Sequence, residues 1–239
     1  MVERFICTEE ASGSNPLGST MKIVSWNIGN FIWLKHLPGR SHYAFQAENI
    51  DEVAELLKKE KADIVFLQEI MDGPDIELII KNFPELPHFL KIKTGDRESV
   101  SLFLSKYHIK EIHHTGSHDY IINGLTFFPV HLDAFSPKIR YAQAKDLILD
   151  LPKEKGVILG DTNFWIFKKL FFSKRDKSSY IKIVNDHIDI LKDLGASCRF
   201  FLSLDKVFIT KDLTDFNSKI VKHKIGHIDH YMISCELFA

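Results

Sequence analysis

The sequence predicts an α/β domain, because strand-like apolar runs alternate along the chain with segments of helical periodicity. Its 239 residues suffice for one large α/β domain, and the apolar share of 45% and the charged share of 26% are those of an ordinary folded protein. Polar residues directly follow several of the strand-like runs. Because strand ends at one edge of a sheet meet at a cleft in layered α/β proteins, this third observation indicates a functional site.

The individual elements follow one another in a regular order. β-rich runs cover 22–26, 63–67, 100–104, 109–113, 125–130, 156–159, 206–209 and 230–234, and helical spacing covers 44–61, 74–83, 136–151 and 183–194. Pro74 stands in the first turn of its helix, where proline is tolerated. No repeat or linker interrupts the order, so we expect residues 21–239 to form a single domain.

Residues 1–20 differ from the rest of the chain. They are rich in turn-forming residues and have no hydrophobic periodicity, and they lack the apolar region and cleavage site of a secretory signal. Met21 then opens a strong strand pattern. We expect residues 1–20 to be a non-native or disordered leader and Met21 to be the natural start.

Charge, cysteine content and hydropathy exclude several classes of protein. Lys and Arg number 31 and Asp and Glu number 32, and the resulting charge of −1 argues against coating of nucleic acid by a broad positive field, while leaving room for a local basic groove. The three scattered cysteines fit neither a disulfide framework nor a zinc ribbon. No stretch approaches the roughly 20 apolar residues of a transmembrane segment. We therefore expect an intracellular, cytoplasmic protein.

Acids, amides and histidines stand at the ends of five strand-like runs. They are Asn27, Glu69, His131, Asp161 with Asn163, and Asp229 with His230. Taken singly, an aspartate after a strand is most often a turn or cap residue, and a histidine there is most often structural. A mixture of carboxylate, carboxamide and imidazole at successive strand ends has no packing reason, so together these residues indicate chemistry.

Seven motifs in order along the chain resemble those of the endonuclease/exonuclease/phosphatase superfamily. They are Ser-Trp-Asn at 25–27, Ile-Val-Phe-Leu-Gln-Glu at 64–69, Ser-Leu-Phe-Leu-Ser-Lys at 101–106, Val-His-Leu at 130–132, Gly-Asp-Thr-Asn at 160–163, Leu-Asp-Lys-Val-Phe-Ile at 204–209 and Ile-Asp-His at 228–230. The resemblance implies a DNase I-like, four-layered α/β sandwich with two mixed β-sheets flanked by helices. It also implies metal-dependent hydrolysis of phosphoesters, and 160–163 and 204–208 look most like the 5′-tyrosyl-DNA phosphodiesterase branch.

The resemblance implies a metal site at Glu69. The amide oxygen of Asn27 would share the metal, and Asp229 would add a second contact. Mg²⁺ or Mn²⁺ is the expected cation, because hard cations prefer oxygen ligands and neutralise the charge of the phosphoester transition state. Gly29 stands where several nucleases of the family carry an acid, so fewer carboxylates are expected in the metal site. Val130 stands where many members carry Thr or Ser, so a hydroxyl that could support the site is missing.

The resemblance also implies catalytic roles for the remaining residues. His230 would activate or orient the attacking water, with the Asp205 carboxylate fixing its tautomer. Asp161 and Asn163 would position the nucleophile and hold a phosphate oxygen. His131 would stabilise or protonate the phosphate and the leaving group.

Segments outside the motifs could contact the substrate. Aromatic and basic residues interleave at 164–182, a composition that suits base stacking, a membrane interface, or an amphipathic helix with its aromatics in the core. A second cluster, at 33–43, contains His36, Arg40 and His42 and could line a cleft. Arg140 and Gln143 are a helical turn apart and either pack or touch the substrate.

Three functions and one rival site follow from these patterns. The favoured function is a phosphodiesterase acting on nucleic acid, as an endonuclease, an exonuclease or a 5′ DNA-adduct phosphodiesterase. The alternatives are a sphingomyelinase-like lipid- or inositol-headgroup phosphodiesterase or phosphatase, and an inactive binding module of the same fold. A monomer is expected, and peripheral membrane contact stays open. A zinc site of His223, His227 and His230 would need a helix there, whereas Gly226 favours a loop.

Overall fold

The structure, a computed structural model, describes residues 20–29, 47–93, 99–114, 117–167, 170–225 and 228–238. The expected leader, apart from Thr20, and the cluster at 33–43 lie outside these residues. The chain divides into two compact units, one of residues 1–109 with 221–239 and one of residues 110–220. Among the described residues, no helix has the length and apolarity that a membrane crossing requires.

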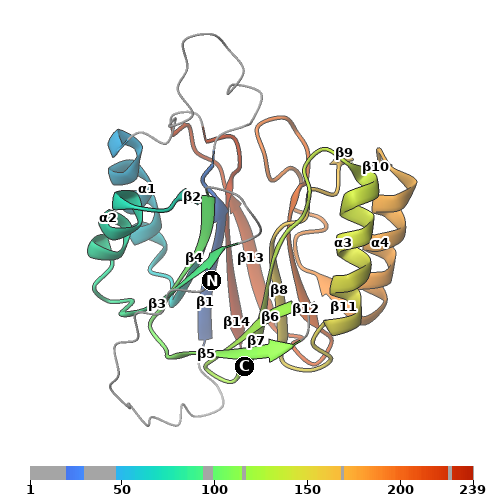
Figure 1. The fold of residues 1–239 in the computed structure, drawn as a ribbon, viewed down its shortest axis with the longest axis horizontal. Coiled ribbons are helices and arrows are strands. Elements are labelled where there is room, and N and C mark those ends of the chain that lie inside the picture. The colour runs from blue at the N-terminus through green and yellow to red at the C-terminus, as the bar shows by residue number, and fades with distance from the viewer. Residues whose placement is uncertain are drawn as a thin grey trace. The chain divides into compact units, whose positions relative to one another are not determined.

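The first unit is built on a mixed sheet of order β13-β14-β1-β2-β4-β3 (Figure 1). Its strands are β1 (Thr20–Asn27), β2 (Ile64–Met71), β3 (His88–Lys93), β4 (Ser99–Ser105), β13 (Phe216–Val221), in which the chain returns to this unit, and β14 (Met232–Phe238). β1 runs parallel to β2 and antiparallel to β14. The parallel pair brings the ends of β1 and β2 to the same edge, with Asn27 opposite Gln68.

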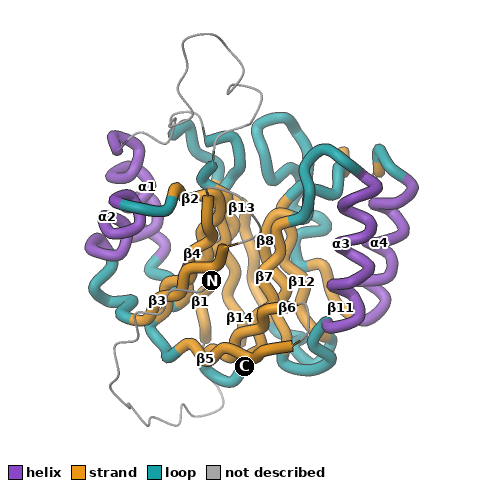
Figure 2. The backbone as a smooth tube through the Cα atoms, viewed as in Figure 1, coloured by secondary structure: helices purple, strands orange, loops and turns teal. Residues whose placement is uncertain are grey.

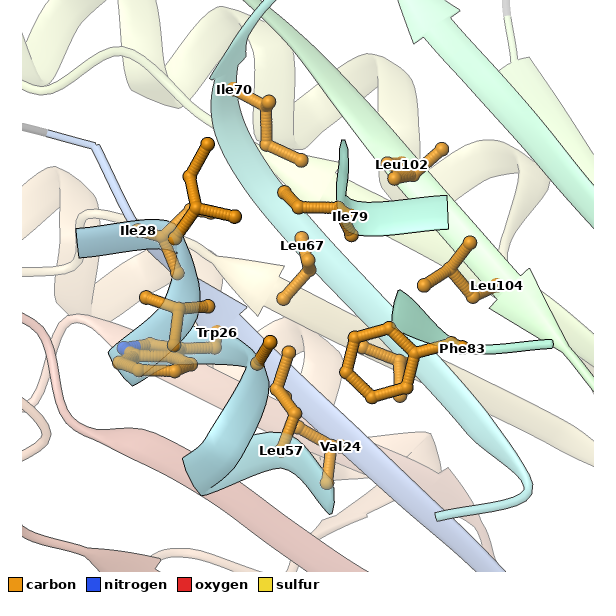
Figure 3. Packing of buried hydrophobic residues seen from close by; sticks show 14 of the residues in the cluster. Val24, Trp26, Ile28, Leu57, Leu67, Ile70, Ile79, Phe83, Leu102 and Leu104 are labelled. Carbon is orange, nitrogen blue, oxygen red and sulfur yellow. The ribbon is translucent and has the colours of Figure 1, made fainter. Parts of the chain in front are cut away.

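Two helices, α1 (Ala47–Glu60) and α2 (Pro74–Asn82), pack on one face of this sheet. Figure 3 shows Leu57 of α1 and Ile79 of α2 in the cluster that also holds Val24 and Trp26 of β1 and Ile28 directly after that strand. The parallel β1–β2 connection needs a crossover, which α1 supplies. Because side chains alternate along a strand, Ser25 and Asn27 point to the opposite face of the sheet.

The second unit carries a mixed sheet of order β11-β12-β8-β7-β6-β5. Its strands are β5 (Ile109–His114), which begins at the unit boundary, β6 (Ser117–Ile122), β7 (Leu125–His131), β8 (Gly156–Asp161), β11 (His187–Asp189) and β12 (Asp205–Thr210). β7 and β8 are parallel, and β12 runs antiparallel to β8. A short hairpin of β9 (Ile166–Phe167) and β10 (Leu170–Phe171) follows β8.

Helices α3 (Pro137–Asp150) and α4 (Lys174–Asp186) lie side by side in this unit (Figure 2). The predicted helix at 183–194 is wrong, because the helix occupies 174–186 and is followed by β11 and a turn. The Ser173 hydroxyl starts α4 by accepting from the N–H groups of Arg175 and Asp176 at 3.2 and 3.4 Å. The helix ends at His187, whose backbone is extended and begins β11.

A buried ion pair joins α3 to α4. Arg140 is 1% exposed and donates from Nε and Nη2 to the two carboxylate oxygens of Asp176, each at 2.9 Å. Its Nη1 also donates to the Asp133 carbonyl at 2.6 Å, and the Gln143 side chain accepts from the Asp133 N–H at 2.8 Å. Arg140 and Gln143 therefore pack structurally and fix the loop after β7.

We expect Arg140→Leu to lower the free energy of unfolding by about 3–5 kcal/mol, because it leaves the buried Asp176 carboxylate without its cation. Urea unfolding followed by circular dichroism measures this loss. The double variant Arg140→Leu with Asp176→Leu should recover much of the stability, since neither charge then remains buried. An equal loss in both variants would contradict this account.

Candidate active site

Three of the predicted site residues form a row across adjacent strands of the second unit. His131 at the end of β7 is the register partner of Asp161 at the end of β8, and Asp161 is the partner of Asp205 at the start of β12. Directly paired residues of a sheet point to the same face. The carboxylate oxygens of the two aspartates lie within 4.8 Å of each other, and both residues are buried.

Asn163 is fixed beside this row by its own loop. Its φ of +50° lies in the left-handed region, which asparagine adopts more readily than most residues. Its N–H donates to Asp161 Oδ1 at 2.9 Å, and its side-chain amide donates to the Leu132 carbonyl at 3.1 Å. Asn163 thus bridges the loops that follow β7 and β8, and hydrogen bonds within the protein fix the position of its side-chain amide.

The start of β12 is held by two hydroxyl groups that are not among the predicted site residues. Ser197 is fully buried, and its Oγ accepts from the N–H groups of Leu204 and Asp205, each at 2.9 Å. The Thr162 hydroxyl donates to the Leu204 carbonyl at 2.7 Å. These bonds tie the Asp161 loop to the strand that presents Asp205, and so fix the spacing of the carboxylate pair.

Lys206 follows Asp205 directly but faces the other side of the sheet. Its Nζ donates to Asp189 Oδ2 at 3.1 Å and to the Ser203 hydroxyl at 3.0 Å, and the Tyr180 hydroxyl donates to the same Asp189 oxygen at 2.8 Å. Burial, followed by the Asp189 carboxylate, raises the pKa of the Tyr180 phenol. This network is structural and lies outside the row of His131, Asp161 and Asp205.

In the first unit, Asn27 ends β1 as a buried turn residue. Its side-chain Oδ1 accepts from the Gly29 N–H at 3.0 Å. An amide oxygen has two lone pairs, so one bond to the backbone fixes the group and still allows a second partner. The orientation of the Asn27 amide is therefore fixed by the backbone.

Glu69 lies in an irregular part of β2. The pairing of β2 with β4 shifts between Leu67 and Ile70, which marks a bulge, and Glu69 has a φ of +60°. A residue other than glycine in this conformation costs of order 1–3 kcal/mol and is concentrated at functional sites. The bulge thus turns Glu69 out of the regular alternation of the strand.

Gly29 explains how Glu69 is accommodated. A Cβ atom added at Gly29 would overlap the Glu69 Cβ and Oε2 atoms and would lie 2.8 Å from Cδ. The Glu69 side chain therefore crosses directly over the glycine backbone. The expected departure from the family pattern at position 29 has a physical reason, because an acid there would occupy the space that Glu69 uses.

The backbone of His230 is anchored by two rings of the same unit. The carbonyl of His230 accepts from Trp26 Nε1 at 3.0 Å and lies 2.8 Å from His223 Nε2. The Ile225 N–H donates to His223 Nδ1 at 3.2 Å, so Nδ1 carries the lone pair and Nε2 the proton of a neutral ring. The His223 ring also packs edge-on against Trp26, with ring centroids 4.7 Å apart. His223 is thus a support for His230 that sequence reasoning considered only as a zinc ligand.

The rival zinc site has no support in the described residues, because 222–225 is irregular and not helical, and His227 lies outside the described residues. Asp229 is 5% exposed and precedes the strand β14.

Of the segment at 164–182, Phe164 is buried in a core cluster and Tyr180 packs against that cluster, while the lysines described at 174, 177 and 182 are exposed. The amphipathic-helix interpretation therefore holds for α4, although Phe172 stays exposed.

Two buried carboxylates of the second unit, Asp161 and Asp205, fit a hard divalent cation. The predicted ligands of the first unit, Asn27, Glu69 and Asp229, are likewise oxygen donors. All of these donors are oxygens, the ligand type that Mg²⁺ and Mn²⁺ prefer. Two buried carboxylates within 4.8 Å repel each other unless a proton or a cation intervenes.

Comparison with known proteins assigns the chain to a family. A family model described as the Endonuclease/Exonuclease/phosphatase family matches residues 24–225. No curated protein gives a significant match to the sequence.

Three solved structures illustrate the likeness in fold. TDP2 of D. rerio, complexed with a single-strand DNA product, is 18% identical with a TM-score of 0.62, covering 92% of this chain and 100% of that chain. The endonuclease domain of TRAS1, a telomere-specific non-LTR retrotransposon, is 12% identical with a TM-score of 0.62, covering 92% and 99%. Beta toxin of Staphylococcus aureus is 18% identical with a TM-score of 0.59, covering 90% and 99%. The expected four-layered α/β sandwich with two mixed sheets is confirmed, and the TDP2 structures agree at the level of fold with the expected leaning in the family.

Proposed function

Because the chain belongs to the endonuclease/exonuclease/phosphatase family, and is thus a phosphoester hydrolase, we propose that it is a divalent-metal-dependent phosphodiesterase whose substrate is nucleic acid. The observation that carries the proposal is the row of the half-buried His131 and the buried Asp161 and Asp205 on three adjacent strands. A row of two carboxylates and an imidazole has no role in packing, and it combines the groups that bind cations with those that move protons.

Glu69 and Asn27 hold the cation in this proposal, and Asp229 adds a contact. When bound, Mg²⁺ or Mn²⁺ neutralises the negative charge that gathers on the phosphate oxygens in the transition state. The chain's contribution is the geometry of the ligands, since the Asn27 amide is fixed by the Gly29 N–H and Glu69 is fixed by the bulge of β2.

The proton transfers fall to the two histidines. We assign to His230 the role of accepting a proton from the attacking water as its oxygen bonds to phosphorus, and to Asp205 the role of holding the ring tautomer. His131 stabilises or protonates the oxygen that leaves when its bond to phosphorus breaks. Asp161 and Asn163 position the water and the phosphate, and the fixed amide of Asn163 supports this role.

Nucleic acid is preferred to a lipid as the substrate because of the exposed side chains at the start of α4. Lys174, Arg175 and Lys177 are all exposed there, and cations suit the repeated phosphates of a polynucleotide. The likeness to a TDP2 structure with a single-strand DNA product supports the same choice. Hydrolysis of sphingomyelin in preference to oligonucleotides would favour the lipid alternative.

Gly29→Ala is expected to weaken metal binding without unfolding the protein. The new methyl group would displace Glu69, and misplacing a ligand or its support typically costs about 10- to 100-fold in metal affinity. Calorimetric titration with Mn²⁺ measures the change, with circular dichroism as the check on folding. Gly124→Ala is the control: nothing lies within 4 Å of a Cβ there, but its φ of +80° disfavours alanine, so this variant tests whether a destabilising glycine substitution away from Glu69 changes Mn²⁺ affinity. Unchanged Mn²⁺ affinity in Gly29→Ala would contradict the placement of Glu69 in the metal site.

A further inference from the structure

The segment that follows the loop of Asp161 exposes two large apolar side chains. Leu170 and Phe172 are 71% and 68% exposed. The Phe172 ring meets the half-buried Trp165 ring edge-to-face, with centroids 6.4 Å apart and planes at 85°. The Phe172 N–H also donates to the Trp165 carbonyl at 3.1 Å. The exposed ring is therefore held in place by local contacts.

The turn that precedes Asp205 exposes two further aromatic rings. Phe200 and Phe201 are 55% and 73% exposed. The Phe201 N–H closes the turn by donating to the Cys198 carbonyl at 3.2 Å. Phe201 has a φ of +63°, a conformation that bulky residues rarely adopt and that is concentrated at functional positions. The turn thus presents two adjacent rings to solvent at the cost of backbone strain.

Hydrogen bonds join the backbones of these two segments. The Ser203 N–H donates to the Ile166 carbonyl at 2.9 Å, and the Thr162 N–H donates to the Leu204 carbonyl at 3.1 Å. Both segments adjoin the strands that carry the carboxylate pair. We name the residues Trp165, Leu170, Phe172, Phe200 and Phe201 the aromatic patch.

The exposed charged residues that adjoin the aromatic patch in sequence are basic. Lys174 and Arg175 are exposed directly after Phe172, and the partly exposed Arg199 precedes Phe200. In the described parts of 162–177 and 196–204, the single acidic residue is Asp176, which is buried in its ion pair with Arg140. The charge beside the patch therefore suits a polyanion.

We propose that the aromatic patch stacks unpaired bases of a single-stranded nucleic acid substrate while the neighbouring cations contact its phosphates. This inference rests on the proposed function and specifies single-stranded nucleic acid as the substrate class of the proposed phosphodiesterase. Every base has a π face, so exposed rings bind bases without sequence preference. A base lies one sugar away from its phosphate, which suits rings carried at the ends of the strands that hold Asp161 and Asp205.

A membrane surface fits the aromatic patch less well. Insertion about 5–10 Å into the headgroup region requires a continuous apolar face. Here the exposed apolar side chains occur as short groups with cations between them along the chain, and Leu170 is the one aliphatic side chain of the patch. Stacking also explains why the exposed groups are rings fixed by turns.

The test uses the double variant Phe172→Ser with Phe201→Ser and the control Leu149→Ser, whose side chain is 78% exposed on α3. Fluorescence anisotropy in EDTA measures the Kd of a single-stranded oligonucleotide and of an abasic oligonucleotide of equal length. We expect the Kd of the normal oligonucleotide to rise about tenfold for each ring removed, and the Kd of the abasic one to stay unchanged. The control should bind both as the wild type does.

Three results for the double variant would overturn the inference. They are an unchanged Kd for the normal oligonucleotide, a Kd for the abasic oligonucleotide that rises equally, or a loss of binding to vesicles of phosphatidylserine and phosphatidylcholine in place of a loss of oligonucleotide binding. Hydrolysis of bis(4-nitrophenyl) phosphate separates this inference from the proposed function. The double variant should retain that hydrolysis. If wild-type protein hydrolyses no phosphodiester, the proposed function fails, whereas intact hydrolysis with unchanged oligonucleotide binding contradicts the stacking role alone.

Discussion

Glu69→Ala is expected to lower the rate of phosphodiester hydrolysis about a thousandfold at a fixed Mg²⁺ concentration. The variant removes the carboxylate that the β2 bulge presents over Gly29, and a metal-bound transition state loses about 4 kcal/mol when its cation is lost or displaced. Because Glu69 is partly exposed and its backbone is strained, its removal should leave the free energy of unfolding nearly unchanged. Initial rates on a fluorescent oligonucleotide give the activity, and thermal unfolding gives the stability.

The matched control for this variant is Glu77→Ala, which removes an exposed glutamate from α2 of the same unit. We expect it to keep full activity, so a loss in both variants would indicate an effect of net charge. Full activity in Glu69→Ala would defeat the assignment of this residue to the metal.

His230→Ala should have the second-largest effect, a loss of about 10²- to 10⁴-fold in kcat, which is the usual contribution of a general base. The KM should change little, because the side chain acts on the attacking water rather than on the bound nucleic acid. The anchoring contacts survive the substitution, since Trp26 and His223 bind the backbone carbonyl of residue 230 and not its ring. Steady-state kinetics of the purified variant measure both constants.

His108→Ala serves as the control, because His108 is exposed on the turn between β4 and β5. It tests whether loss of any imidazole has the same effect. An unchanged kcat in His230→Ala, or a rise in KM without a fall in kcat, would remove His230 from the proton-transfer step.

The sequence predicts the fold well wherever one strand or helix has a clear period of its own. The central strands β1, β2, β4, β7, β8 and β12 are buried along most of their length and read as continuous apolar runs, so their positions are confirmed within a few residues. The strands β3, β6, β9, β10, β11 and β13 are absent from the predicted runs. β3 and β13 lie at the edges of their sheet, where half-exposed faces carry lysine and other polar residues that blur the alternation.

The supports of the candidate site are the part that sequence reasoning could not find. Ser197 binds the start of β12 across a turn, and Trp26 binds the carbonyl of a residue 204 positions away. Such contacts depend on how strands pair, and no local pattern reports them. The sequence does single out His223, because it is one of three histidines close in sequence and so a candidate zinc ligand. In the structure, His223 instead forms hydrogen bonds that support His230.

The departure at Gly29 shows how the structure adds a reason to a sequence pattern. The sequence identifies a glycine where several nucleases of the family carry an acid, and this alone suggests a metal site with fewer carboxylates. The structure shows that the glycine leaves room for Glu69, whose side chain would otherwise clash. One carboxylate thus lies where two would not fit without a shift of the bulge.

The most direct test of the account is the hydrolysis of three substrates by the purified protein with Mg²⁺ and, separately, with EDTA: a single-stranded oligonucleotide, a 5′-phosphotyrosyl oligonucleotide and sphingomyelin. We predict that Mg²⁺ supports cleavage of at least one of the two oligonucleotides, that EDTA abolishes it, and that sphingomyelin is cleaved slowly or not at all. Oligonucleotide cleavage that persists in EDTA, or the absence of cleavage with both Mg²⁺ and Mn²⁺, would contradict a cation-dependent phosphodiesterase of nucleic acid.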